Sequence, residues 1–120
     1  MQITINGRGM ELTDAIKDYV EKKISALDKF YDKIIRANIT VGVESHHHQK
    51  GSIFVAECKL EVPGKDIFAS KNEKTLYKAI DKIRDYLEGE LKKHKTKERV
   101  KSKKDVRAVR EEKEYKPEIY

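Results

Sequence analysis

The sequence of 120 residues is poor in the residues that build disulfides, tight turns and membrane spans. It contains one cysteine, Cys58, two prolines and no tryptophan. A single cysteine excludes a disulfide framework and a cysteine-based zinc site. No apolar run approaches the roughly 18 residues that a spanning helix needs, so we expect no membrane segment. The first residues show no basic segment followed by an apolar one, which predicts a cytoplasmic protein without a secretory signal.

Little in the sequence supports catalysis. It has no glycine-rich phosphate loop and no serine or cysteine elbow, and no carboxylate pair is isolated on an apolar surface. Three of its four histidines are adjacent, His46–His48, and adjacent side chains rarely face one metal ion. Cys58 alternates with apolar residues, which predicts a buried and unreactive thiol. We therefore expect a protein that is not an enzyme and has no cofactor, metal or small-molecule substrate.

Charge, in contrast, is abundant and unevenly distributed. The chain has 27 basic and 21 acidic side chains, a formal charge of +6. Residues 1–70 hold ten of each sign, residues 71–104 hold thirteen basic and six acidic, and residues 105–120 hold four basic and five acidic. The positive field thus belongs to one segment, which favours a polyanionic partner. A solvated helix followed by a soluble tail is the alternative interpretation.

Apolar periodicity predicts six elements in the order β-α-β-β-β-α. A period of two predicts strands, and a stripe repeating every three or four residues predicts helices. Thr13 and Asn72 are the expected N-caps of the helices. Residues 96–120 have no sustained apolar period, so we expect a flexible tail there, basic and then mixed in charge, after a folded domain at residues 1–95. The predicted strands are 2–6, 35–43, 54–62 and 67–70, and the predicted helices are 14–30 and 72–94.

This order predicts one α+β domain with a four-stranded mixed sheet and both helices on one face. The first two strands, joined through a helix, can pair in parallel by a right-handed crossover. The other strands join antiparallel through short connections. The second sheet face is then polar and exposed to water, which antiparallel sheets allow.

Lysines on the second predicted helix are the main candidate site. Lys71, Lys74, Lys78 and Lys82 are spaced 3, 4 and 4 residues apart, which predicts a row on one helix face with few acidic partners. Such a row suits phosphate contacts better than base reading. Ordinary decoration of a solvated helix is the alternative. The complete set of candidate phosphate-binding residues is Lys22, Lys23, Lys29, Lys74, Lys78, Lys82, Lys92, Lys93 and Lys95.

Three segments resemble a known family. They are the opening Met1–Thr13, the stretch Ala15–Phe30 and the segment Leu76–Asp81, which reads Leu-Tyr-Lys-Ala-Ile-Asp. Together with the order of elements, they resemble the ribosome hibernation-promoting factor family over about residues 1–95. That family includes the ribosome-associated inhibitor A proteins and was once catalogued as sigma-54 modulation proteins.

The resemblance implies a stress-response or stationary-phase protein of the cytoplasm. Its partners would be the small ribosomal subunit, the 16S-type rRNA and the intact ribosome, and the protein would be monomeric when off the ribosome. It would occupy the decoding channel used by mRNA and tRNA, so that translation stops while the ribosome is preserved. The candidate lysines would then contact rRNA.

The chain departs from the family pattern at a few positions. Thr75 stands where the family usually has Asp, and Tyr86, Gly89 and Glu90 stand where it has Lys, Arg and Gln. Gly89 also costs about 1 kcal/mol in a helix, which predicts a bend or fraying there. The length suggests a short member of the family, although Lys116–Tyr120 resembles the start of the second domain of long members. The basic stretch 95–104 would lie along the mRNA path.

Two further functions remain as alternatives. The order α-β-β-β-α, without the first strand, is also typical of double-stranded RNA-binding modules, which read duplex shape with similar lysines. A protein-interaction module that modulates transcription would need an exposed apolar patch. Ile53 and Val55, on the predicted outer face of the sheet, are the one indication of such a patch.

Overall fold

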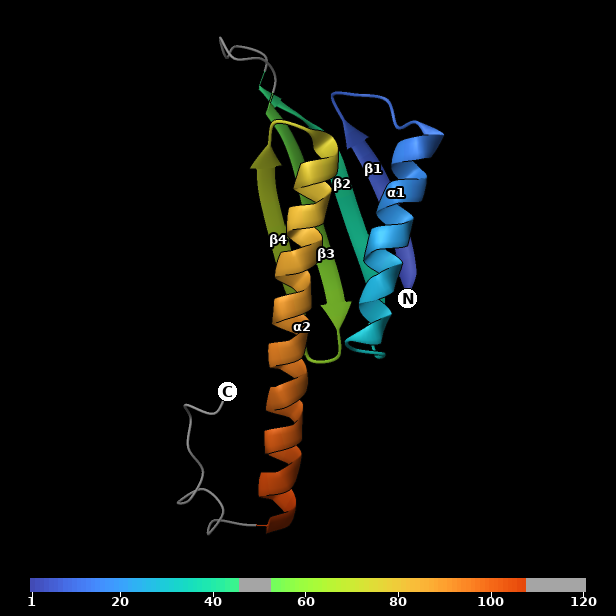
Figure 1. Ribbon diagram of the computed structural model, residues 1–120. Helices are drawn as coiled ribbons and strands as arrows, with labels where there is room; N and C mark the ends of the chain where they lie inside the picture. The colour runs from blue at the N-terminus through green and yellow to red at the C-terminus, as the bar shows by residue number, and fades with distance from the viewer. Residues whose placement is uncertain (46–52, 108–120) are drawn as a thin grey trace.

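The structure, a computed structural model, describes residues 1–45 and 53–107, and within that part it does not describe the side chains of residues 44, 45 and 101–107 (Figure 1). The strands and helices follow one another in the order that the apolar periods predict, with a short 3-10 helix added after the first helix. The elements are β1 (Gln2–Arg8), α1 (Asp14–Ser25), a short 3-10 helix η1 (Ala26–Lys29), β2 (Arg36–Ser45), β3 (Ile53–Val62), β4 (Lys65–Glu73) and α2 (Leu76–Arg107).

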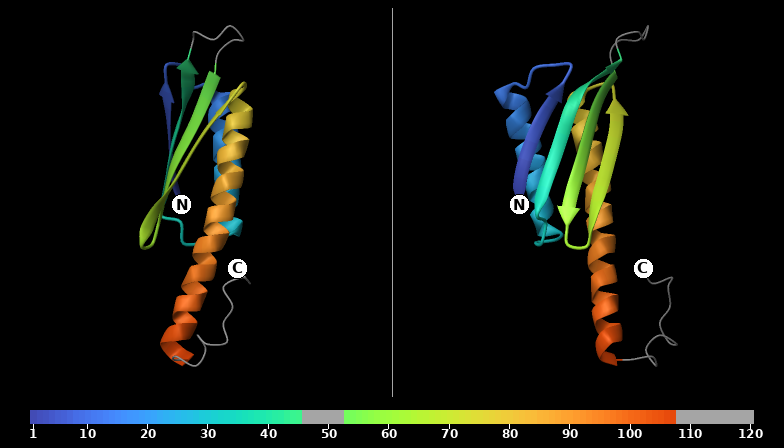
Figure 2. Two further views of the ribbon diagram at one scale, coloured as in Figure 1. Left: turned by 90° about the vertical axis from the view of Figure 1, so that its left-hand side faces the viewer. Right: turned by 180° about the vertical axis from the view of Figure 1, so that it is seen from behind.

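The four strands form one sheet in the order β1-β2-β3-β4. β1 pairs in parallel with β2, and the other two pairs are antiparallel. Figure 2 shows both helices on the same face of this sheet. The register places Ile39 opposite Cys58 and Cys58 opposite Ala69, so the small and branched side chains beneath the helices lie side by side. The predicted α+β class, the mixed sheet and the one-sided helical layer are confirmed.

The hydrophobic core lies between this sheet face and the two helices. α1 contributes Ile16, Val20 and Ile24, and α2 contributes a stripe that is buried from Leu76 to Leu91. Full burial of one such aliphatic side chain contributes roughly 1.5–3 kcal/mol. The stripe of α2 therefore holds the longest helix of the protein onto the sheet.

Hydroxyl caps fix where both helices begin. Thr13 Oγ1 accepts from the Ile16 N–H at 3.2 Å, which confirms Thr13 as the first N-cap. Thr75 Oγ1 accepts from the Lys78 N–H at 3.2 Å, so α2 begins at Leu76. The prediction of Asn72 as the second cap is wrong, because that residue lies in β4, paired with Val55.

The C-terminal end of α2 differs most from the prediction. The helix continues past His94 to Arg107, so the prediction that it ends near His94 is wrong, and residues 96–107, which were expected in the tail, continue α2. No glycine or proline follows Gly89 before residue 107, and lysine and arginine are good helix formers. The helix is also continuous through Gly89. Residues 108–120, the rest of the predicted tail, lie outside the described residues.

One helix boundary and one strand boundary, near α1 and β2, also differ from the prediction. The predicted helix 14–30 is divided into α1 and η1, because the backbone tightens to 3-10 geometry at Ala26. Ile35, the first residue of the predicted strand 35–43, precedes β2 and is 52% exposed. Ile34 is buried in its place.

The outer sheet face is polar, as predicted. Ion pairs join Arg8 to Glu57, Arg36 to Glu61 and Lys59 to Asp66, each with nitrogen and oxygen 3.6 Å apart. The expectation that Val55 forms an exposed apolar patch is wrong, since it is 1% exposed. Phe68, paired with Lys59, is the large apolar side chain that this face exposes within the described residues.

The thiol of Cys58 is fully buried in the core, and burial raises its pKa to about 12. A raised pKa leaves almost no thiolate near pH 8, and the thiolate is the reactive form. We therefore expect folded protein to react with an aromatic disulfide reagent at pH 8 far more slowly than protein in 6 M guanidinium, by about a hundredfold or more. Equal rates in the two solvents would contradict the burial of this thiol.

Two glycines provide a matched pair for testing local packing. A Cβ on Gly89 would meet nothing within 4 Å, whereas a Cβ on Gly42 would lie 2.1 Å from the Arg8 carbonyl oxygen. We expect Gly89→Ala to raise the free energy of unfolding by about 0.5–1 kcal/mol, because alanine is the better helix former. Gly42→Ala should lower it, since β1 and β2 must separate. Urea denaturation measures both changes, and destabilisation by Gly89→Ala would show that α2 is not regular there.

Candidate nucleic-acid interface

The two halves of α2 carry opposite balances of charge. Residues 76–91, which cover the sheet, hold three basic and four acidic side chains. Residues 92–107, named here the helical arm, hold nine basic and two acidic side chains. The positive excess of the segment recognised in the sequence therefore lies on the arm and not on the part of α2 that packs on the sheet.

The helical arm projects beyond the sheet. Figures 1 and 2 show α2 running past the turn between β3 and β4 with no strand behind it. Within the described part of α2, the last buried residue is His94. Sixteen residues at 1.5 Å each give the arm a length of about 24 Å. The side chains of residues 95–100, the described part of the arm beyond His94, are all exposed or half-buried.

Cations surround the arm. Lys92, Lys93, Lys95, Lys97 and Arg99 are all exposed. Successive helical residues are rotated by about 100°, so Lys95 and Lys97 point to opposite sides. A cationic surface on several sides of a rod suits contact with phosphates from more than one direction.

The lysine row predicted for the start of α2 is largely wrong. Lys71 lies in β4, with its Nζ 5.2 Å from the centroid of the Tyr86 ring, and Lys74 precedes the helix. Only Lys78 and Lys82 of the predicted row lie on α2. The row therefore has two helical members, and the other two positions belong to the strand end and the connection.

Lys82 also has an internal partner that the sequence pattern did not indicate. Its Nζ is paired with the carboxylate of Glu73 at the end of β4, and hydrogen bonding from Lys82 lowers the pKa of Glu73. Lys78 is exposed and makes no ion pair within the described residues. Lys78 is thus the more available of the two for an external phosphate.

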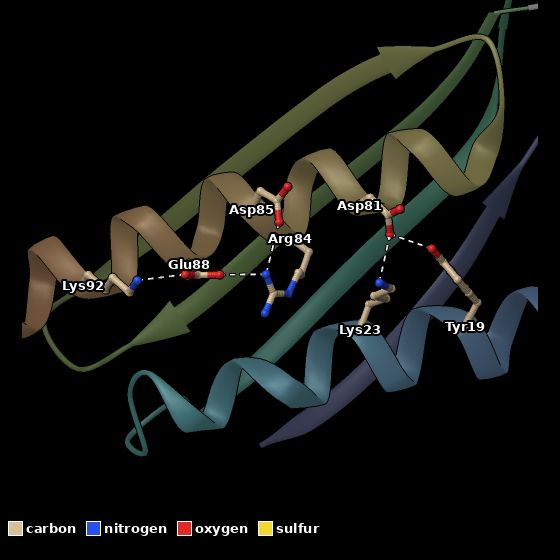
Figure 3. A network of polar contacts seen from close by, with 7 residues as sticks. All are labelled: Tyr19, Lys23, Asp81, Arg84, Asp85, Glu88 and Lys92. Atoms are coloured by element: carbon tan, nitrogen blue, oxygen red, sulfur yellow. Dashed lines mark hydrogen bonds and ion pairs between the residues drawn. The ribbon is translucent and has the colours of Figure 1, made fainter.

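A second internal contact joins α1 to α2. Asp81 Oδ1 accepts from the Tyr19 hydroxyl at 2.6 Å and lies 3.5 Å from Lys23 Nζ (Figure 3). This hydrogen bond, followed by burial, raises the pKa of Tyr19 to about 12. The Tyr77 ring packs edge to face on Tyr19, with centroids 4.7 Å apart. Lys23, a candidate contact, is therefore already engaged in holding the helices together.

The base of the arm is tied to the domain by a chain of charges. Glu88 accepts from Arg84 at 2.7 Å and from Lys92 at 2.8 Å (Figure 3), and the bond from Lys92 lowers the pKa of Glu88. Arg84 and Lys92 also lie over the Phe30 ring, at 5.6 and 5.1 Å. Because Phe30 follows Lys29, these contacts place η1 beside the start of the arm.

The remaining candidates fall into two groups. Lys22 and Lys29 are exposed at the end of α1 and in η1, and they form no ion pair among the described residues. Lys93 bonds to Glu90 at 3.3 Å, while Lys95 has no such partner in the described part of the chain. The structure therefore brings Lys29, Lys92, Lys93 and Lys95 toward the arm and leaves Lys74, Lys78 and Lys82 near the other end of α2.

Lys97 and Arg99 are exposed on the arm but were absent from the candidate set, and the helix that carries them was expected to end near His94. Two features of the sequence could have extended it. No glycine or proline interrupts residues 90–107. The buried stripe also continues from Leu91 by three residues to His94, the spacing of a continuing helix.

Other predicted features carry no site within the described residues. The triple His46–His48 lies outside them. Among the residues that the structure covers, no group of three His, Cys, Asp or Glu side chains is placed to hold a metal ion. In the same residues, no helix combines the length and the apolar character that crossing a membrane requires.

Comparison with known proteins identifies the family. A family model described as "Sigma 54 modulation protein / S30EA ribosomal protein" matches residues 3–99. The chain belongs to this family. The S30EA family is non-enzymatic, which confirms the prediction that the chain is not an enzyme.

Curated relatives cover about four fifths of the chain. A ribosome hibernation promoting factor of Azotobacter vinelandii is 36% identical over 98 residues, covering 82% of this chain and 86% of that protein. A factor of the same name from Escherichia coli K12 is 33% identical over 97 residues, covering 81% and 96%. A ribosome hibernation promotion factor of Deinococcus radiodurans is 40% identical over 97 residues, 80% of this chain and 50% of its own length.

Solved structures agree with this assignment. The N-terminal domain of Thermus thermophilus Protein Y superimposes with a TM-score of 0.69 at 35% identity, over 78% of this chain and 99% of that one. A ribosomal subunit interface protein of Coxiella burnetii gives a TM-score of 0.71 at 24% identity, over 80% and 99%, and supports the fold alone. The S30EA family match ends at Arg99, and α2 continues beyond it to Arg107.

The position of the charge predicts how RNA binding depends on salt. We expect neutralising Lys95, Lys97 and Arg99 with glutamine to reduce the slope of log Kd against log salt by about 2, because each phosphate contact contributes about 0.7–0.9. Anisotropy of a labelled 20-nucleotide RNA measures the slope. The matched control neutralises Lys17, Lys59 and Lys65, exposed residues outside the arm. Equal effects of both triples would show that total charge, and not the arm, governs binding.

Proposed function

We propose that this protein is a ribosome hibernation factor that binds the small ribosomal subunit and blocks its decoding channel. The observation that carries the proposal is the concentration of nine basic side chains, against two acidic ones, on a helical arm that projects from a neutral domain. Occupation of the channel by the domain and arm excludes mRNA and tRNA, so translation stops while the ribosome stays intact.

The chemistry of the arm supports a phosphate backbone as the partner. Lysine is a compact cation on a flexible stem, suited to phosphate contact but not to the bidentate reading of bases. We expect the main rRNA contacts to come from the arm, so Lys97 and Arg99 join the original candidates. Those candidates are Lys22, Lys23, Lys29, Lys74, Lys78, Lys82, Lys92, Lys93 and Lys95.

Family membership supports the ribosome as the source of that backbone. The relatives that share a third or more of their residues with this chain are named ribosome hibernation promoting factors. The partners proposed are therefore the small subunit, its 16S-type rRNA and the intact ribosome, with a protein that is monomeric off the ribosome and acts in the cytoplasm under stress or in stationary phase. A rod about 24 Å long can enter a channel that a globular surface cannot.

The alternatives have less support from the structure. A transcription modulator would need an exposed apolar patch, and Val55, one of its two candidate residues, is buried. A general double-stranded RNA binder would use the same cations. An experiment must therefore distinguish this hypothesis from ribosome hibernation.

Co-sedimentation through sucrose gradients tests the proposal. We expect the protein to migrate with small subunits and intact ribosomes, and to be displaced by mRNA with bound tRNA but not by a free RNA duplex. Lys95→Glu with Lys97→Glu should reduce the bound fraction at least tenfold, since two attractive contacts become repulsive. Lys17→Glu with Lys59→Glu changes the net charge equally and should bind nearly as the wild type does.

The outcomes of this experiment distinguish the hypotheses. Complete displacement by the duplex would indicate a general RNA binder. Binding that survives prebound mRNA and tRNA would place the site elsewhere on the ribosome and overturn the decoding-channel proposal.

A further inference from the structure

A polar cluster lies where the helical arm leaves the domain. Tyr31, which follows η1, donates from its hydroxyl to Glu98 Oε2 at 2.9 Å. The rings of Tyr31 and His94 pack edge to face, with centroids 5.3 Å apart and planes at 74°. His94 Nε2 lies 3.6 Å from Glu98 Oε2 and has no hydrogen-bond partner within the described residues. The proposed rRNA contacts include none of these three residues.

The cluster continues the buried stripe of α2 with polar residues. Leu87, Leu91, His94 and Glu98 follow one another at intervals of four, three and four residues, so they share a helix face. Leu87 and Leu91 are fully buried, and Tyr31 and His94 are 2% and 9% exposed. Where the arm leaves the domain, the buried stripe is thus followed by a part-buried hydrogen bond between Tyr31 and Glu98, and not by another hydrophobic contact.

Glu98 has a special place in the charge pattern. It is the sole acidic residue between positions 92 and 104. Its carboxylate accepts the hydrogen bond of Tyr31 and lies beside His94. The one negative charge in this stretch is therefore directed at the domain.

The arm needs such a contact because its own charges oppose helix formation. Lys95 and Arg99 are four residues apart, as are Lys97 and Lys101. Like charges at this spacing destabilise a helix by about 0.2–0.5 kcal/mol per pair, and short helices are marginal in water. Tyr31 donates its hydrogen bond to Glu98, which lies four residues beyond His94, the last buried residue of the described part of α2. The bond therefore attaches the domain to a point on the arm past the buried stripe.

We propose that the hydrogen bond from Tyr31 to Glu98 positions the arm: it holds residues 95–107 helical and in line with the domain, so that the arm's cations reach RNA as one preorganised surface. Tyr31 and Glu98 are positioning residues and not contacts. The effect on RNA binding rests on the proposed function, whereas the effect on the arm does not. Burial, followed by the bond to Glu98, raises the pKa of Tyr31 to about 12, so the hydroxyl remains a donor at neutral pH.

Hydrogen exchange on the free protein tests the positioning role directly. Tyr31→Phe removes the hydroxyl and keeps the ring on His94. We expect the amides of residues 98–104 to exchange about tenfold faster, the ratio supported by a hydrogen bond to a charged group. The amides of residues 79–91 should keep their protection, which shows that the domain is folded.

A matched control separates this effect from the loss of any tyrosine hydroxyl. Tyr19→Phe removes the bond to Asp81, a second carboxylate of α2, far from the arm. Its arm amides should exchange as in the wild type. Glu98→Ala removes the acceptor instead and should accelerate arm exchange although alanine is the better helix former. Unchanged arm exchange in both Tyr31→Phe and Glu98→Ala overturns the proposal.

Ribosome binding then tests the consequence. Tyr31→Phe keeps every cation, so we expect small-subunit affinity to fall three- to tenfold with an unchanged slope against salt. Faster arm exchange with unchanged affinity overturns the claim that ordering of the arm by Tyr31 strengthens RNA binding. Absence of wild-type ribosome binding overturns the proposed function, and the exchange experiment still decides whether Tyr31 orders the arm.

Discussion

The burial of the apolar stripe of α2 against the sheet is the contact on which the rest of the structure depends. The stripe fixes the helix axis, and the inward register of β2, β3 and β4 supplies the surface beneath it. α1 then packs beside α2 through the contact of Tyr19 and Lys23 with Asp81. Because a helix is stiff, holding residues 76–91 on the sheet also sets the direction in which residues 92–107 leave it.

The same helix has two environments, and its charges follow them. Over the sheet, two of the three cations of α2 have acidic partners: Arg84 pairs with Glu88 on the helix, and Lys82 pairs with Glu73 at the strand end. With equal numbers of paired cations and acids, these ion pairs leave that surface almost neutral. Past the sheet, acids nearly disappear. A charge that is local in this way directs a polyanion to one part of the molecule.

The sequence predicted the architecture well because apolar periodicity records which side of each element is buried. The first residue of α2 was harder to predict, since Asn72 and Thr75 are both good N-caps and only the length of β4 decides between them. The partner of Lys82 could not be found by helix spacing, because Glu73 lies on a strand. Val55 shows the same limit: strand alternation assigns its face, but not its 1% exposure. The sequence thus located the basic segment, whereas the helical form of residues 96–107 was not predicted.

The shape matters for binding. A disordered basic tail loses conformational entropy when it orders on a partner, about 1–2 kcal/mol for each backbone residue fixed. A helical arm has already lost that freedom in the free protein, and its like charges are relieved when phosphates approach. Preorganisation and charge therefore both favour binding. The clustered positive charges that destabilise the free helix also attract the arm to a polyanion. A helix in this state requires an anchor at its base, which is the place where the structure has Tyr31, His94 and Glu98.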